Sequence, residues 1–152
     1  MQRGWDRMTS MLGSDLRPAF REVFAPWWHE QIARVYGTEG SHLLGHWKPL
    51  SENYREWKEK NFGPMPILQL TGRMRKAMTG ITSSGAYVTM SRQSMEIGVN
   101  GIPYIRAHQY GVPKHKLPAR PHFGIKKEWM RTLDGRMRVW LKKHELEFEG
   151  KR

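Results

Sequence analysis

The stretch Ala86-Tyr87-Val88-Thr89-Met90-Ser91-Arg92-Gln93-Ser94-Met95-Glu96-Ile97-Gly98-Val99 decides the fold class. Apolar and polar residues alternate in its first five positions and again in its last six, so that Met95, Ile97 and Val99 share one face. A period of two is typical of β-strands, and we expect two paired strands here. The surrounding patterns are helical, so the sequence predicts an α+β fold in which several helices pack with a small antiparallel sheet.

The first residues of the chain have a short helical pattern. Trp5, Met8 and Leu12 recur at helical spacing and Gly13 follows as a stop. Such a short helix is marginal in water on its own. We therefore expect residues 1–13 to form a mobile N-terminal arm.

A longer helix is predicted to follow this arm. Ser14 or Asp15 can cap its start, and Gly37 is a natural end. Pro26 lies inside the pattern and should kink the helix, because proline has no N–H to donate to the preceding turn.

Two more helices are predicted between the loop at 38–47 and the sheet. Ser51 is placed to cap the first, which should end by Gly63. The second is predicted from the apolar face of residues 67–78 and should close at Gly80.

The region after the sheet is partly ambiguous. Residues 102–110 can return as a strand or form a short helix that stops at Gly111, and we favour the helix. Residues 113–121 contain three prolines and several basic residues, which indicates an exposed, extended connector.

The last helix has the clearest pattern in the chain. Its apolar residues recur at helical intervals: Ile125, Trp129, Leu133, Met137, Trp140 and Leu141. Residues 145–152 are expected to fray as a C-terminal tail. The predicted organisation is thus one α+β domain over residues 14–144, a size that suits a single core.

Composition narrows the classes of function. The chain carries a net charge of +12, and from Lys114 to Lys143 ten basic residues accompany only two acidic ones. A positive potential attracts nucleic acid or acidic protein surfaces. The chain has no Cys, which excludes disulfides and thiolate zinc sites, and no apolar run approaches the length of a membrane span. We expect no membrane partner and synthesis in a cytoplasm.

The sequence offers little for catalysis. His42 and His46 are four residues apart, but Gly45 lies between them and no Glu adjoins His42, so loop histidines are a better interpretation than metal ligands. Ser83-Ser84-Gly85 is not a nucleophile elbow, and Thr71-Gly72-Arg73 is not a phosphate loop. We therefore expect neither an enzyme nor a cofactor or metal.

Four short blocks carry a family resemblance. They are Trp47-Lys48-Pro49-Leu50-Ser51, Ile67-Leu68-Gln69-Leu70-Thr71-Gly72, Ala107-His108-Gln109-Tyr110-Gly111 and Pro118-Ala119-Arg120-Pro121. In this order the chain resembles the virion-morphogenesis, or tail-completion, proteins of tailed bacteriophages of the Mu type. The likeness spans roughly residues 20–140. His122 is a departure, because the family pattern usually has Phe directly after the second proline of the last block.

The resemblance implies a structural protein of the virion neck that completes the tail or joins it to the head. Related joining proteins form rings, commonly hexameric, around the DNA channel. The implied partners are other copies of the chain, the portal or head–tail connector, the tail terminator or tail tube, and channel DNA through non-specific contact. An accessory protein that binds nucleic acid is the alternative.

Two sets of candidate residues follow. Residues expected at protein interfaces are Trp5, Met8, Leu12, His108, Gln109, Lys114, Lys116, Pro118, Arg120 and Pro121. Residues expected to face DNA are Arg73, Lys76, Lys126, Lys127, Arg131 and Arg138. The chain also has seven Trp, which is difficult to bury fully in one small domain, so we expect at least one to meet a partner subunit.

Overall fold

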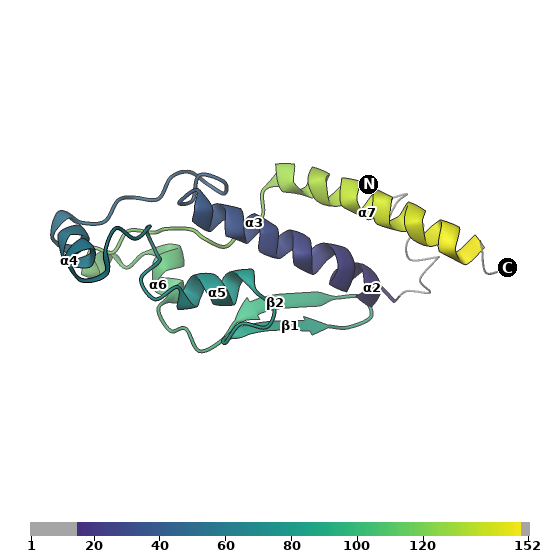
Figure 1. The fold of residues 1–152 in the computed structure, drawn as a ribbon, viewed down its shortest axis with the longest axis horizontal. Coiled ribbons are helices and arrows are strands. Elements are labelled where there is room, and N and C mark those ends of the chain that lie inside the picture. The colour runs from purple at the N-terminus through teal and green to yellow at the C-terminus, as the bar shows by residue number, and fades with distance from the viewer. Residues whose placement is uncertain (1–14, 150–152) are drawn as a thin grey trace. The chain divides into compact units, whose positions relative to one another are not determined.

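The predicted fold class is confirmed. A computed structural model describes residues 15–149, with side chains as far as His144. It has an α+β fold whose sheet consists of two antiparallel strands, β1 (Ala86–Met90) and β2 (Met95–Val99), as Figure 1 shows. The predicted N-terminal arm, including Trp5, Met8 and Leu12, lies outside the described residues. Within residues 15–149, no helix has the length and apolar character that a bilayer span requires.

The first described helical region consists of three consecutive pieces. Helix α2 (Arg17–Ala19) is followed by the π-helical turn η1 (Phe20–Phe24) and by helix α3 (Ala25–Gly37). In η1 the Ala25 N–H donates to the carbonyl of Phe20, five residues back. This π-helical turn lies directly before Pro26, and the kink expected at that proline stays a prediction.

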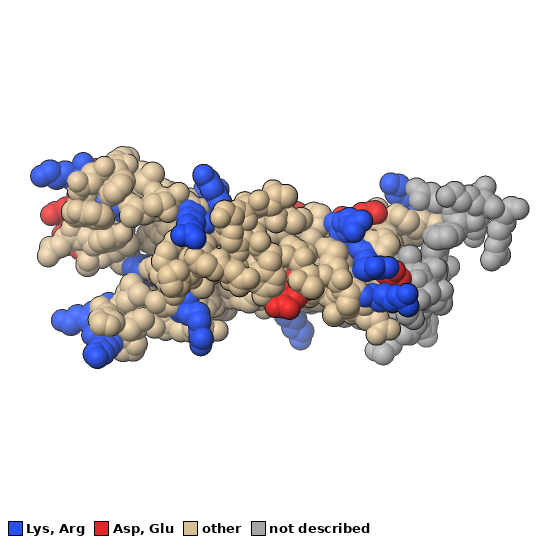
Figure 2. Space-filling view, turned by 90° about the horizontal axis from the view of Figure 1, so that it is seen from below, with Lys and Arg blue, Asp and Glu red and all other residues tan. Residues whose placement is uncertain are grey.

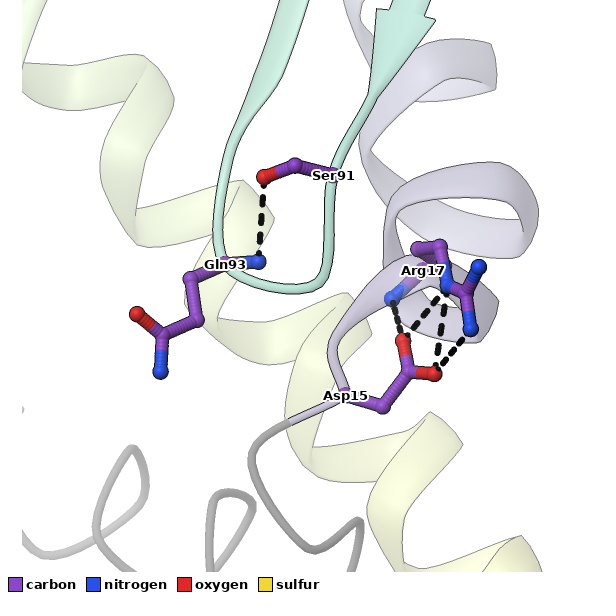
Figure 3. A network of polar contacts seen from close by, with 4 residues as sticks. All are labelled: Asp15, Arg17, Ser91 and Gln93. Carbon is purple, nitrogen blue, oxygen red and sulfur yellow. Dashed lines mark hydrogen bonds and ion pairs between the residues drawn. The ribbon is translucent and has the colours of Figure 1, made fainter.

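The start of this region is tied to the turn between the strands. The Asp15 carboxylate accepts hydrogen bonds from the Arg17 backbone N–H (3.1 Å) and side-chain Nε (2.9 Å), as Figure 3 shows. Ser91 Oγ accepts from the Gln93 N–H (3.3 Å) inside the turn, and the Leu16 N–H donates to the Arg92 carbonyl (2.7 Å). The Arg17 side-chain hydrogen bond lowers the pKa of Asp15 to about 2.

Helix α4 (Glu52–Phe62) is predicted correctly at both ends, whereas the next helix is not. Ser51 occupies the N-cap position of α4, and Gly63 ends the helix with a positive φ of 78°. The following helix, α5, covers only Arg73–Thr79 and starts six residues later than predicted. Leu68 (φ 59°) and Gly72 (φ 71°) have left-handed backbone conformations that an α-helix cannot contain.

The favoured helix after the sheet is confirmed as α6 (Ile105–Tyr110). The prediction of an exposed, extended connector at 113–121 holds for the exposure of residues 113–116 but is otherwise wrong in two ways. It begins with the 3₁₀ helix η2 (Pro113–His115), and Val112 pairs with Leu117 in an isolated antiparallel bridge. Its end is buried, since Arg120 is only 3% exposed.

Helix α7 (Lys127–Glu149) is longer at its C-terminus than predicted. The backbone is helical as far as Glu149, and fraying of residues 145–152 stays a prediction. Ile125 precedes the helix and is 61% exposed, so it does not belong to the buried stripe. The rest of that stripe is confirmed as buried: Trp129, Leu133, Met137, Trp140 and Leu141.

The described chain divides into two compact units. One contains residues 15–28, 88–97 and 125–149, and the other contains residues 29–87 and 98–124. In the first unit α7 packs against η1, where Trp140 Nε1–H donates to the Glu22 carboxylate (2.7 Å). In the second unit the largest fully buried side chain is Tyr36, whose ring meets Trp47 edge-on.

Gly40 tests the packing of the second unit. It has a φ of 91°, and a Cβ there would lie 2.4 Å from Trp47 Cδ1 and 2.7 Å from the Gly45 carbonyl oxygen. We predict that Gly40→Ala lowers the free energy of unfolding by about 2 kcal/mol or more, because both the backbone and the buried indole must shift. The matched control is Gly37→Ala, where a Cβ meets nothing within 4 Å. Equal effects in urea unfolding would contradict the prediction.

Candidate functional site: a basic pocket beside helix α4

The second unit contains a cavity of about 900 Å³ beside α4. Its walls come from the segment before α4, from α4, from the turn before α5, from α6 and from the loop at 115–120. Figure 2 shows a hollow flanked by Lys and Arg side chains in the left part of the view, where α4 lies in Figure 1. We call this cavity the basic pocket.

The lining of the basic pocket is cationic and apolar. None of the described residues that line it is Asp or Glu. Apolar wall is supplied by Leu50, Leu70 and Met74, among others. The basic lining residues are Lys48, Lys58, Arg73, His108, His115, Lys116 and Arg120. An excess of cationic groups in the lining of a partly apolar concavity produces a positive potential that attracts anions.

Lys58 is the one buried residue of the otherwise exposed helix α4, and its side chain is only 3% exposed. Its ammonium group donates to the backbone carbonyls of Met65 (3.0 Å) and Pro66 (2.7 Å). Burial lowers the pKa of Lys58, and the charge of Glu39 opposes that shift. These hydrogen bonds fix α4 to the segment that follows it.

Arg120 also lines the pocket. Its Nε and Nη2 donate to the carbonyls of Lys48 and Pro49, each at 2.9 Å. Trp47 Nε1–H donates to the Pro121 carbonyl (2.7 Å). Burial lowers the pKa of Arg120, although a guanidinium stays charged in proteins. Arg120 and Pro121 were expected at a protein interface within an exposed connector. The exposure is wrong for Arg120, whose buried guanidinium joins segments about 70 residues apart, while its interface role stays a prediction.

Helix α6 contributes His108 and Gln109 in different ways. His108 lines the pocket, and its Nδ1 is buried without a hydrogen-bond partner among the described residues. Burial lowers the pKa of His108, and the charge of Arg120 adds to the shift. Gln109 instead holds the loop, since its amide accepts from the backbone N–H groups of His122 and Phe123 and donates to the Phe123 carbonyl.

His122 fills the interior position after the second proline. It is fully buried, while Phe123 is 45% exposed. Its Nδ1 lies 3.1 Å from the Arg120 carbonyl, and its ring is 6.0 Å from that of Tyr36. A neutral imidazole with a proton on Nδ1 can donate to that carbonyl. Burial lowers the pKa of His122 to about 4.

The four blocks of the family resemblance come together around this pocket. The first block is bonded to Arg120 and Pro121 of the fourth block. The third block is bonded to the fourth, since the Arg120 N–H donates to the His108 carbonyl (2.7 Å). The second block lines the pocket through residues 68–72.

An exposed aromatic cluster lies on α4 beside the pocket. Tyr54 stacks on Trp57 with ring centres 5.5 Å apart, and Phe62 meets Trp57 at the same distance. Tyr54 is 42% exposed, whereas Trp57 and Phe62 are each 47% exposed. We call these three residues the α4 aromatic cluster. Contiguous exposed aromatic surface is typical of protein interfaces.

The candidate interface residues are distributed unevenly. His108, Lys116, Pro118 and Arg120 line the basic pocket, whereas exposed Lys114 does not. The structure also shows lining residues outside the two candidate sets, including Lys48, Lys58 and Tyr104. For Lys58 the sequence gives no signal of a lining position, because a solvated lysine is ordinary in the C-terminal half of a helix.

The six candidate DNA-facing residues fall in different units. Arg73 and Lys76 belong to the second unit, and Arg73 also lines the pocket. Lys126, Lys127, Arg131 and Arg138 belong to the first unit. Arg138 is paired with Asp134 at 2.9 Å. On the face drawn in Figure 2, blue Lys and Arg side chains outnumber red acidic ones but form separate groups.

The two histidines considered as metal ligands have other partners. His42 Nε2 lies 2.9 Å from the Gln31 side-chain oxygen, and His46 lies 3.6 Å from the Glu39 carboxylate. Among the described residues, no three His, Asp or Glu side chains are grouped in a way that could hold a metal ion.

We predict that His122 makes stability depend on pH. An unfolded His titrates near pH 6.5, so the unfolded chain takes up a proton between pH 7 and 5, whereas His122 with a pKa of about 4 does not. Acidification from pH 7 to 5 should therefore destabilise the fold by about 2 kcal/mol through this residue. Urea unfolding of the wild type and of His122→Asn, which can still donate to the Arg120 carbonyl, isolates the effect. The prediction would be refuted if the difference in unfolding free energy between the two proteins were the same at pH 7 and pH 5.

Comparisons of this chain with protein-family models, with curated proteins and with solved structures gave no match.

Proposed function

We propose that this chain is a structural protein of the neck of a tailed-bacteriophage virion. In this role it completes the tail or joins it to the filled head. It acts as one subunit of a ring, most simply a hexamer, around the DNA channel. Its partners are other copies of itself, the head–tail connector and the tail terminator or tube.

The observation that carries the proposal is that the four blocks of the resemblance lie around one pocket. Hydrogen bonds join Trp47 to Pro121, and Arg120 to the carbonyls of Lys48 and Pro49. Residues that are far apart in the sequence thus contact one another around the same pocket. Because the shared blocks build one binding feature, the resemblance concerns a part of the molecule that can receive a partner and not merely scattered core positions.

The α4 aromatic cluster supports the same role. Tyr54, Trp57 and Phe62 leave large apolar surfaces exposed on a helix whose only buried residue is Lys58. Aromatic side chains dominate the energetics of subunit interfaces because they bury much area with little loss of side-chain entropy. A ring subunit requires such a surface for its neighbours.

DNA binding by itself is the alternative role, and the net charge of +12 is the observation that favours it. The two proposals differ in measurable ways. A DNA-binding protein loses affinity steeply as salt concentration rises, because phosphate contacts release counterions. An assembly protein that acts through its protein contacts needs no such affinity for duplex DNA.

We predict that removal of the gene from the phage that encodes this chain gives DNA-filled heads and separate tails, because the ring that joins them is missing. Electron microscopy of the lysate measures this, and expression of the wild-type chain from a plasmid should restore complete particles. Normal numbers of infectious particles without the gene, or a block in DNA replication, would contradict the proposal.

We predict that Trp57→Ala weakens self-association of the purified chain by about tenfold or more, as expected when an interface anchor is truncated. Sedimentation over a range of protein concentrations provides the measurement. Tyr110→Ala is the control, since Tyr110 is an even more exposed aromatic residue at 72% and is outside the cluster. Equal association constants for the two variants would argue against the α4 aromatic cluster as the subunit contact.

A further inference from the structure

We propose that the basic pocket binds the acidic segment Glu145–Glu149 of a second copy of this chain. The inference rests on the proposed function and deepens it, because it names a contact through which neighbouring ring subunits hold one another.

The charge of the pocket favours an anionic ligand. Its two most buried cations, Lys58 and Arg120, are held by neutral backbone carbonyls and not by carboxylates. A carbonyl satisfies hydrogen bonds but does not cancel charge, so the cavity retains a net positive potential. The other cations of the lining add to it, and no described lining residue is acidic.

The apolar part of the pocket wall favours a ligand that also has apolar side chains. Leu50, Leu70 and Met74 form part of its wall. A volume of about 900 Å³ is in the range of cavities that enclose a ligand the size of a short peptide. A DNA duplex offers rows of phosphates and cannot place apolar groups in such a cavity. An acidic peptide that also carries apolar side chains satisfies both demands.

The chain contains one segment of that chemistry. Residues 145–149 read Glu-Leu-Glu-Phe-Glu, and no other window of five residues has three acidic ones. Leu146 and Phe148 supply apolar groups between the carboxylates. In a chain with only 14 acidic residues and a net charge of +12, this local reversal of charge complements the basic pocket.

The symmetry of such a contact favours a ring. The pocket and the acidic segment are different surfaces of the same chain, so their pairing between copies is heterologous. Heterologous contacts produce a closed ring when the rotation between subunits closes. The proposed occupant therefore gives the oligomer that the proposed function needs.

The first test uses a fluorescent peptide of residues 144–150 and the full chain at concentrations below self-association. We expect saturable binding by fluorescence anisotropy, and a peptide with Gln at its three Glu positions should bind about tenfold more weakly. Arg73→Gln/Lys116→Gln should weaken binding of the Glu peptide about tenfold, since both residues line the pocket. The matched control, Lys76→Gln/Lys114→Gln, removes the same charge from residues outside the lining and should have little effect.

Several results of this test would overturn the inference. They are the absence of peptide binding, equal loss in the two double variants, and equal binding of the Glu and Gln peptides. Tighter binding of a duplex oligonucleotide to the same pocket, with no displacement by the peptide, would assign the site to nucleic acid instead.

The second test asks whether the occupant comes from another copy. Glu145→Gln/Glu147→Gln/Glu149→Gln in the full chain should weaken self-association in sedimentation about tenfold. The control Glu30→Gln/Glu96→Gln/Glu128→Gln changes the net charge equally at residues outside α4 and the pocket lining, and should not weaken self-association. Unchanged association in the first variant, or a monomer that binds added peptide more tightly once its own segment is altered, would overturn the assignment to a second copy. Failure of these two tests on purified protein refutes the contact between the pocket and the acidic segment. Normal particles after removal of the gene refute the neck function, so the two failures can be told apart.

Discussion

The buried guanidinium of Arg120 is the constraint on which the second unit depends. It spans from the loop after α6 to the carbonyls of Lys48 and Pro49, and the Trp47–Pro121 hydrogen bond lies beside it. Removal of one partner from a buried charged contact leaves the other unsatisfied, so both segments are held in place. Because the acceptors are neutral, the same arrangement that closes the fold leaves the basic pocket positively charged. The Arg120 guanidinium therefore both stabilises the fold and contributes to the positive charge of the pocket.

The sequence predicted the elements whose signals are local. The alternation in residues 86–99 gave the hairpin, Ser51 and Gly63 marked the ends of α4, and apolar spacing gave the buried stripe of α7. Residues 67–72 were wrongly placed in a helix, because their apolar spacing suits a helix while Leu68 and Gly72 have left-handed conformations. Apolar spacing alone does not reveal a backbone turn that tertiary packing imposes.

The site was less predictable for a related reason. Proline and basic residues at 113–121 indicate an exposed loop on average, yet Arg120 is buried because its acceptors come from a segment about 70 residues earlier. Lys58 was hidden in the same way, since its carbonyl partners lie beyond the end of its own helix. His122 looked like a departure from the family pattern, but it fills the interior beside Tyr36. The burial of these side chains depends on contacts with distant parts of the chain, which the neighbouring sequence does not reveal.

The two surfaces of the second unit suit a subunit of an assembly. The α4 aromatic cluster offers apolar area, and the basic pocket offers charge and a defined concavity, which together provide affinity and orientation. We propose that this chain forms a ring in the neck of a virion, and cryo-electron microscopy of the neck in intact particles is the decisive experiment. We expect a closed ring of this chain around the DNA channel, with α4 and the basic pocket of each copy facing a neighbour. A neck without this chain, or a ring in which both surfaces face solvent, would contradict it.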